Sequence, residues 1–315
     1  MRTILSIDGG GIRGIIPATV LAHIESRVGP LARHFDLIAG TSTGGIIAVG
    51  LTCPKPGTTE PMYSAAALAE LYQKRGPEIF HISAWQRVAS GLGLLDEKYP
   101  AKPIEKVLLD YFADTQLGAA LTNVLVSAYD IESRSPFFFK SWRKEFAGVP
   151  MRAVARATSA APTYFEPAQV EACGAVHPLV DGGVFVNNPA MSAYVEATRL
   201  FPGEREFLVV AVGTGTATQP LRFKDVRNWG LVGWARPVLD VVFDGVSDAV
   251  DYQLDYLLDQ QYYRFQAELA IAKHGLGDAS PANLDALKLE AQKILSSNQP
   301  RIDALCTRLT ELQRA

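Results

Sequence analysis

The chain has 315 residues, of which 48% are hydrophobic and 20% are charged, and its formal net charge is -3 at pH 7. This composition is ordinary for a globular protein with a sizeable core, and it lacks the basic excess typical of proteins that bind nucleic acid polymers. Cys53, Cys173 and Cys306 lie far apart without a C-x-x-C pair, which favours reduced thiols in a cytoplasmic protein. No apolar run reaches the roughly 18 residues of a membrane span, so we expect membrane contact to be peripheral, on the inner face.

Short apolar strands alternate with helical patterns along the chain. We expect strands at 3–7, 35–39, 122–131, 135–142, 177–181 and 206–212. We expect helices at 15–27, 43–51, 64–75, 102–112, 152–160 and 189–200, and a mostly helical part from about residue 233. This alternation predicts an α/β fold in which helices cover both faces of a mainly parallel central sheet, within one domain over 1–315.

A glycine-rich turn, "DGGGIRG" at 8–14, follows the first predicted strand. Its Gly9, Gly11 and Gly14 fit the G-x-G-x-x-G spacing of a dinucleotide-binding turn. Such a turn is accompanied by an acidic residue at the end of the second strand, whereas Asp36 stands at the start of that strand. The sequence therefore favours an anion other than a dinucleotide.

A second glycine turn, "GTSTG" at 40–44, lies between a predicted strand and a predicted helix. The pattern G-x-S-x-G in this context is typical of a nucleophile elbow. Gly40 and Gly44 permit a tight turn, and Ser42 stands at its tip at the N-terminus of the helix, where the helix dipole favours developing negative charge. The pattern also occurs by chance in loops, so its context carries the interpretation.

A nucleophilic serine needs a base. None of the five histidines lies in a recognisable motif, so a Ser–His–Asp triad is poorly supported. His177, which precedes a strand and can also cap or pack, is the alternative base. Asp181, in "LVDGG", follows an apolar strand and precedes two glycines, which predicts a carboxylate at the carboxyl edge of the sheet. An aspartate in this position can also be a structural turn residue.

Taken in order, the motifs at 8–14, 40–44 and 181–183 resemble those of the patatin family of lipid acyl hydrolases. Further segments resemble later blocks of that family, so that the resemblance covers roughly residues 3–266. These segments are "RATSAAPTYFEP" at 156–167, "NNP" at 187–189, "VGTG" at 212–215 and "YYRFQ" at 262–266.

The resemblance implies a three-layer α/β/α fold and a phospholipase A type activity that cleaves fatty-acyl esters through a covalent acyl-serine. Ser42 is then the nucleophile and Asp181 its base, without an intervening histidine. The oxyanion hole is carried by Gly9, Gly10 and Gly11. Arg13 either supports the charge of this loop or of a substrate phosphate, or forms a structural ion pair.

The sequence carries no EF-hand loop and no H-E-x-x-H motif, so we expect chemistry without a metal and without a cofactor. A hypothesis of another class is a lipid-binding or regulatory protein that keeps the fold without catalysis. The intact pair of Ser42 and Asp181 argues against it.

The resemblance makes the surface of a phospholipid membrane the expected partner. Candidate membrane segments are 227–243, with Trp229 and Trp234, and 80–95, although both can also pack in the core. The chain also resembles stand-alone bacterial patatin-like enzymes, some of which are cyclic-nucleotide-activated effectors of anti-phage defence. A cyclic nucleotide activator is therefore an expectation from resemblance alone, since no motif here specifies its pocket.

The C-terminal stretch 281–313 has leucines and an isoleucine at helical spacing, among them Ile302, Leu305, Leu309 and Leu312. This apolar face predicts either packing against the sheet or a homo-oligomer interface, and packing within the chain is the commoner outcome.

Overall fold

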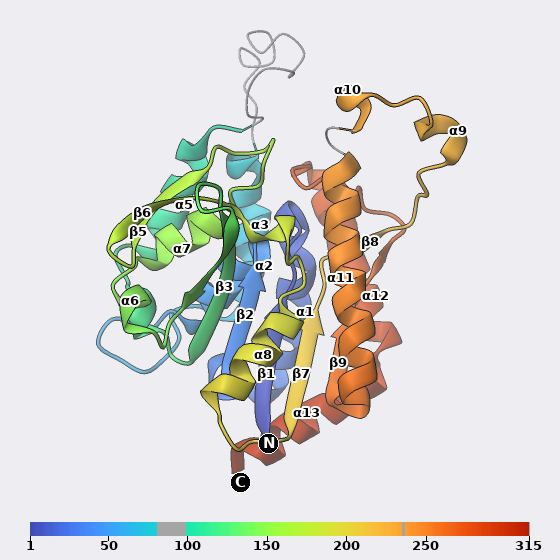
Figure 1. Ribbon diagram of the computed structural model, residues 1–315. Coiled ribbons are helices and arrows are strands. Elements are labelled where there is room, and N and C mark those ends of the chain that lie inside the picture. Colours follow the sequence, from blue (N-terminus) through green and yellow to red (C-terminus); the bar gives the residue numbers. More distant parts are fainter. Residues whose placement is uncertain (81–98, 235–236, 315) are drawn as a thin grey trace.

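The computed structural model describes residues 1–80, 99–234 and 237–314 (Figure 1). The strands of its main sheet are β1 (Arg2–Ile7), β2 (Leu37–Thr41), β3 (Asn123–Asp130), β4 (Ser135–Lys140), β5 (Ala168–Ala172), β6 (Ala175–Asp181), β7 (Phe207–Val212) and β9 (Tyr262–Phe265). They run in the order β5-β6-β3-β2-β1-β7-β9, with β4 paired to β3. Strands β3, β2, β1, β7 and β9 are parallel to one another. β4 and β6 each pair antiparallel with β3, and β5 pairs antiparallel with β6. The predicted, mainly parallel sheet is thus confirmed.

Helices cover both faces of this sheet (Figure 1). The helices are α1 (Ile15–Val28), α2 (Thr43–Thr52), α3 (Ala65–Ile79), α5 (Ala101–Phe112), α6 (Lys144–Ala147), α7 (Met151–Thr158), α8 (Ala190–Leu200), α9 (Phe223–Val226), α10 (Leu231–Trp234), α11 (Pro237–Leu258), α12 (Pro281–Ser297) and α13 (Gln299–Arg314). On one face, a first hydrophobic core packs the sheet against α1, α2, α3, α12 and α13. A second core on the same face packs the sheet against α5 and α7. On the other face a third core joins the sheet to α8 and α11, which completes the three α/β/α layers.

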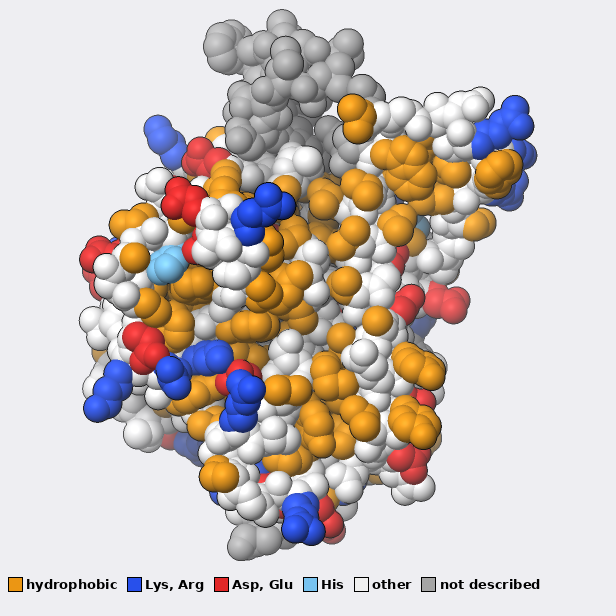
Figure 2. Space-filling view, viewed as in Figure 1, with side chains coloured by type: hydrophobic (Ala, Val, Ile, Leu, Met, Phe, Trp, Pro, Cys, Tyr) orange, Lys and Arg blue, Asp and Glu red, His pale blue; other side chains and the backbone are white. Residues whose placement is uncertain are grey.

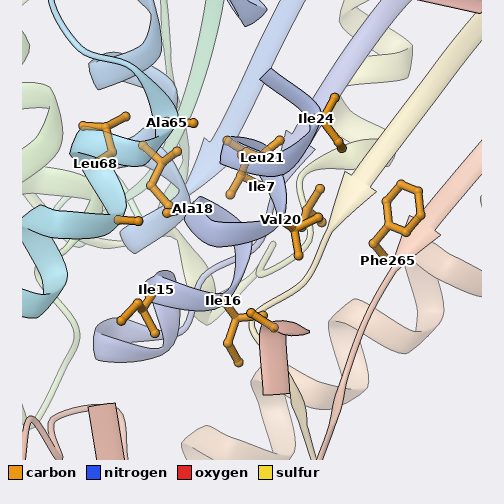
Figure 3. Close-up of a cluster of buried hydrophobic side chains, with 14 of the residues drawn as sticks. Ile7, Ile15, Ile16, Ala18, Val20, Leu21, Ile24, Ala65, Leu68 and Phe265 are labelled. Carbon is orange, nitrogen blue, oxygen red and sulfur yellow. The ribbon is translucent and has the colours of Figure 1, made fainter. Parts of the chain in front are cut away.

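The two sides of a strand supply the two faces, because successive side chains of a strand point in opposite directions. Leu5 and Ile7 of β1 belong to the core under α1, whereas Ile4 belongs to the core under α8. Helix α1 buries a continuous apolar stripe against the first of these cores (Figure 3). It ends at Val28 and is capped by Gly29, whose φ of 91° lies in the left-handed region that favours glycine.

The C-terminal helices pack within the chain. Ile302, Leu305 and Leu309 of α13 are fully buried in the core that also contains α1, and Leu312 packs at its margin. Of the two interpretations of this stretch, intramolecular packing is therefore confirmed. Within the described ranges, no helix combines the length and apolar character needed to cross a membrane.

Four strands were not predicted. β5 forms a hairpin with β6, β9 completes the sheet beside β7, and β10 (Glu268–Leu269) pairs with β8 (Thr216–Ala217) in a separate ribbon. Each has five residues or fewer, and β9 carries Arg264 in its middle. Tertiary pairing rather than an apolar pattern therefore determines these strands.

Candidate active site

The serine turn lies at the carboxyl end of the parallel strands. β2 ends at Thr41, Ser42 follows, and α2 begins at Thr43, which is the strand–turn–helix context that the G-x-S-x-G pattern predicted. Ser42 is only 7% exposed. Its hydroxyl therefore stands at the N-terminus of a buried helix in a largely water-free setting.

The backbone of Ser42 is strained. Its φ of 55° and ψ of -124° lie outside the regions that a side chain with a Cβ ordinarily adopts. The conformation is held from both sides, since the Ser42 N–H donates a 2.8 Å hydrogen bond to Thr158 Oγ1 and the Ser42 carbonyl accepts from Ile46 N–H. Thr158 belongs to "RATSAAP", a segment that resembles a family block but to which the sequence alone assigned no role.

The two glycines of the turn allow backbones to approach closely. A Cβ on Gly40 would collide with the backbone of Gly44 and Gly45, and a Cβ on Gly44 would collide with the carbonyl oxygens of Ile7 and Asp8. These neighbours are main-chain atoms that cannot rotate away. Both glycines are therefore required for the elbow to pack against the end of β1.

Asp181 lies in the same row of the sheet, two strands away from Ser42. β3 pairs Ser127 with Thr41 on one side and Ala128 with Asp181 on the other, so both turns leave the sheet at the same level. The Asp181 side chain is fully buried and its Oδ1 accepts from Gly183 N–H at 2.8 Å. Among the described residues, its Oδ2 has no hydrogen-bond partner.

Burial raises the pKa of Asp181 from 3.8 to about 7, because a charge loses its water there. The Ser42 hydroxyl, followed by Gly183 N–H, lowers this pKa. Ser42 Oγ and Asp181 Oδ2 nevertheless do not reach the geometry of a full hydrogen bond. Such bonds commonly tighten only when substrate is bound.

The glycine loop approaches Ser42 directly. A Cβ on Gly9 would lie 2.3 Å from Asn187 Oδ1 and 3.1 Å from Ser42 Cβ, so the loop can approach Ser42 this closely only with glycine at this position. The Gly9 N–H already donates to the Asn187 carbonyl at 3.0 Å, and the Gly9 carbonyl accepts from Thr214 Oγ1 at 2.6 Å. Gly10 and Gly11 head a short 3-10 helix over Gly11–Gly14, where the first N–H groups have no partner within the helix.

Arg13 is buried beneath the same loop and its Nε donates to the Gly10 carbonyl at 3.4 Å. Burial lowers the pKa of its guanidinium, and Asp244 and Asp240 of α11 act in the opposite direction. Burial likewise raises the pKa of both aspartates while Arg13 lowers it. Arg13 therefore holds the loop from inside and faces an acidic side of α11.

A buried ion-pair network anchors the start of the loop. Asp8 accepts a 2.7 Å hydrogen bond from Arg264 of β9, and Arg264 also donates to Asp251 of α11 at 2.8 Å. Burial raises the pKa of Asp8 to about 6 even though Arg264 lowers it. Asp8 therefore has a structural role, in which it is held by a residue of "YYRFQ" whose position in the fold the sequence did not reveal.

An apolar pocket opens beside Ser42. It is formed by side chains from α2, α3, α5 and the segment after α7, and its aliphatic and aromatic wall includes Ile46, Leu71, Ile79, Val107, Leu108 and Phe165. Gly11 and Ser42 belong to the same wall. The site therefore combines a polar corner at the serine with a mainly apolar lining, as small-molecule sites usually do.

The other residues considered from the sequence, His177 as a base and Asp36 as a ribose ligand, lie away from Ser42. His177 is bonded through Nδ1 to Asp130 Oδ2 at 2.8 Å, and it precedes Asp181 by four strand residues, or about 13 Å. Asp36 accepts from Arg2 and from Thr3 N–H at the opposite end of the sheet. Neither the histidine base nor a dinucleotide ribose site is therefore formed here. No metal-binding group of three or more His, Cys, Asp or Glu side chains occurs among residues 1–80, 99–234 and 237–314.

The two candidate membrane segments have different outcomes. In 227–243, Trp229 and Trp234 are half-buried against each other, with ring centroids 5.4 Å apart, and belong to none of the hydrophobic cores. The segment 80–95 lies, apart from Phe80, outside the described residues.

The chain is similar to several known proteins. The family model described as "Patatin-like phospholipase" matches residues 5–194. "Patatin-like protein 2" of Oryza sativa subsp. indica is 33% identical over 96% of this chain and 86% of its own length, and "Probable inactive patatin-3-Kuras 1" of Solanum tuberosum is 31% identical over 95% and 87%. Among solved structures, VipD from Legionella pneumophila aligns with a TM-score of 0.43 and 13% identity over 94% of this chain and 67% of its own.

Proposed function

This chain belongs to the patatin-like phospholipase family, and from that premise we propose that it is a lipid acyl hydrolase of the phospholipase A type. Its substrates are the fatty-acyl esters of membrane phospholipids, which it meets at the bilayer surface. One observation carries the proposal: a strained serine turn and a buried carboxylate with an unused oxygen end in the same row of the sheet. The name of the potato relative shows that family membership alone does not guarantee activity, so the argument depends on these residues.

In the first step Ser42 Oγ attacks the ester carbonyl carbon while its proton passes to Asp181 Oδ2. The bond to the glycerol oxygen then breaks, and Asp181 returns the proton to that oxygen. A lysophospholipid leaves and the acyl group remains on Ser42. Water hydrolyses this acyl-serine by the same route, with Asp181 as the base. A carboxylate whose pKa is about 7 suits both roles, because it can accept and release the proton near neutral pH.

The oxyanion formed in each step lies against the glycine loop. We assign its donors to the N–H groups of Gly10 and Gly11, since the Gly9 N–H is bonded to Asn187. Gly9 then contributes the close approach of the loop to Ser42 rather than a hydrogen bond to the oxyanion. Arg13 supports the loop through the Gly10 carbonyl, and the N-terminus of α2 adds its dipole. Loss of one such donor typically costs about 10²–10³ in rate.

The apolar pocket beside Ser42 is the proposed place of the fatty-acyl chain. Its aliphatic and aromatic lining offers no strong partner to a head group but matches a hydrocarbon chain. An ester whose acyl chain occupies this pocket brings its carbonyl carbon to the Ser42 end of the wall.

The test is fatty-acid release from a mixed phospholipid extract, followed by mass spectrometry. Ser42→Ala and Asp181→Asn should each abolish release, whereas Ser133→Ala, which removes an exposed hydroxyl, should not. A fluorophosphonate probe should label the wild-type protein at Ser42. Release that persists in both site variants contradicts the proposal, and a folded protein that binds lipid but never labels is a non-catalytic binding protein.

A further inference from the structure

A segment at the carboxyl end of the sheet stands away from the body of the molecule. Residues 218–234, which we call the protruding segment, connect β8 to α11 and contain only the short helices α9 and α10. Figure 1 shows both helices projecting at the end toward which the parallel strands run. The segment is therefore on the side of the molecule where Ser42 and Asp181 lie.

The protruding segment exposes large apolar side chains. Leu231 is 93% exposed and Phe223 is 77% exposed, and Leu221 is also exposed. Trp229 and Trp234 pack on each other and leave part of each ring open. Packing within residues 1–80, 99–234 and 237–314 leaves these surfaces exposed, and exposed apolar groups of this kind mark interaction sites.

Cations alternate with these apolar groups. The protruding segment contains three exposed basic residues, Arg222, Lys224 and Arg227, and a single acidic residue, Asp225. It is therefore basic, although the whole chain has a net charge of -3. Within the described ranges none of these three cations forms an ion pair, whereas many other exposed cations of the chain do. Figure 2 shows hydrophobic and basic side chains together at this corner, over α9 and α10.

We propose that the protruding segment docks on the surface of an anionic phospholipid bilayer. Phe223 and Leu231 enter the boundary between head groups and acyl chains, and the three cations meet the lipid phosphates. Charge complementarity selects this occupant, because an apolar protein partner would not need the cations. The inference rests on the proposed function only in that the same bilayer would supply the substrate.

The position of α11 connects this surface with the catalytic turn. α11 begins at Pro237, shortly after the protruding segment, and its Phe243 ring would lie 3.0 Å from a Cβ on Gly183, beside Asp181. The same helix carries Asp240 and Asp244, whose charges act on Arg13. Docking through 218–234 therefore presents the Ser42 side of the molecule to the bilayer.

The test is co-sedimentation of the full chain with vesicles, carried out in the Ser42→Ala background so that no lipid is consumed. Vesicles of phosphatidylcholine with about one third phosphatidylglycerol are compared with phosphatidylcholine alone. Phe223→Asp with Leu231→Asp should weaken binding to the mixed vesicles at least about tenfold. Charge reversal of Arg222, Lys224 and Arg227 should also weaken binding to the mixed vesicles. Added salt should weaken the binding of the unchanged protein in the same way. Leu289→Asp on α12, also exposed, is the matched control and should have little effect.

The same substitutions in the protein with Ser42 should leave hydrolysis of a soluble short-chain ester unchanged, which separates this proposal from the proposed function. Absence of that hydrolysis in the wild type would count against the proposed function and leave the docking assay intact. Unchanged vesicle binding in the Phe223 and Leu231 variant overturns the docking proposal. A dimer in gel filtration that the variant converts to a monomer also overturns it, since the occupant is then a second copy of the chain.

Discussion

Arg264, on the last strand of the main sheet, donates a 2.7 Å hydrogen bond to Asp8, the residue that opens the glycine loop. Asp8 is 1% exposed, so this contact is a buried ion pair. Arg264 also bonds Asp251 of α11, and Tyr262 donates to the same carboxylate. One side chain therefore fixes the loop that faces Ser42 to both the edge of the sheet and α11.

Replacement of Arg264 with Met should lower the free energy of unfolding by about 3–5 kcal/mol, because it leaves Asp8 buried without its cation. Without Arg264 the pKa of Asp8 rises further, because Arg264 lowers it, so the loss should shrink as the pH falls toward about 6 and be smallest below it, where Asp8 is protonated in both folded proteins. Urea unfolding at two pH values measures both effects. Arg199→Met, which removes a 76% exposed guanidinium, is the control and should change stability by less than about 0.5 kcal/mol.

Thr158 should matter through a single hydrogen bond. Thr158→Val keeps the shape of the side chain but leaves the Ser42 N–H without its acceptor, which we expect to cost about 1–3 kcal/mol and to loosen the strained turn. The rate on a soluble ester should fall while KM changes little. Thr158→Ser retains the hydroxyl and should restore most of the rate. Equal rates for the Val and Ser variants would exclude this role.

The main features of the fold could be predicted from sequence because they depend on local patterns. Apolar runs that end in glycine placed Ser42 and Asp181 at strand ends. The parallel strands β1 and β2 bring the glycine loop and Ser42 to one edge of the sheet, whereas Asp181 reaches the same level through the antiparallel pairing of β6 with β3, which the local pattern did not reveal. The G-x-S-x-G pattern likewise located the serine turn at 40–44, because it lies between a predicted strand and a predicted helix. These signals need no knowledge of distant residues.

The partners of those residues could not be predicted, because each contact joins segments far apart in the chain. Thr158 meets Ser42 from 116 positions away, and Thr214 meets Gly9 from 205 positions away. The occupied N–H of Gly9 likewise depends on a carbonyl of residue 187. Sequence blocks matched without a role thus form the walls of the site. The assignment of Ser42, Asp181 and the loop donors to catalysis stays a prediction.

Gly44 should tolerate no side chain. Gly44→Ala puts a Cβ into the carbonyl oxygens of Ile7 and Asp8, so we expect the chain to lose several kcal/mol of stability or to fail to accumulate as folded protein. Gly245→Ala on the exposed side of α11 meets nothing within 4 Å and should stabilise the protein by up to about 1 kcal/mol. Circular dichroism melts compare the two. A folded and active Gly44→Ala protein would show that the elbow is not packed as described.

The pH dependence of hydrolysis should follow Asp181. The carboxyl must be ionised to accept the serine proton, and burial raises its pKa to about 7. The value of kcat/KM on a soluble ester should therefore rise about tenfold per pH unit below about pH 7 and level off above it. An inflection near pH 4 would mean that the carboxylate is solvated, which its burial contradicts.

Burial of Asp181 should also make the stability of the protein fall as the pH rises, whereas its activity should rise. Folded Asp181 holds its proton up to about pH 7, whereas in the unfolded chain it releases it near its ordinary 3.8. Its contribution to stability is therefore fully present below about pH 4 and declines as the pH rises toward 7. Asp181→Asn carries no titrating charge, so it should exceed the wild type by about 2–4 kcal/mol at about pH 8 and by almost nothing at about pH 4. Guanidinium unfolding at the two pH values measures this difference, and an Asn variant that is less stable at the higher pH would mean that the ionised carboxylate is compensated in the folded state.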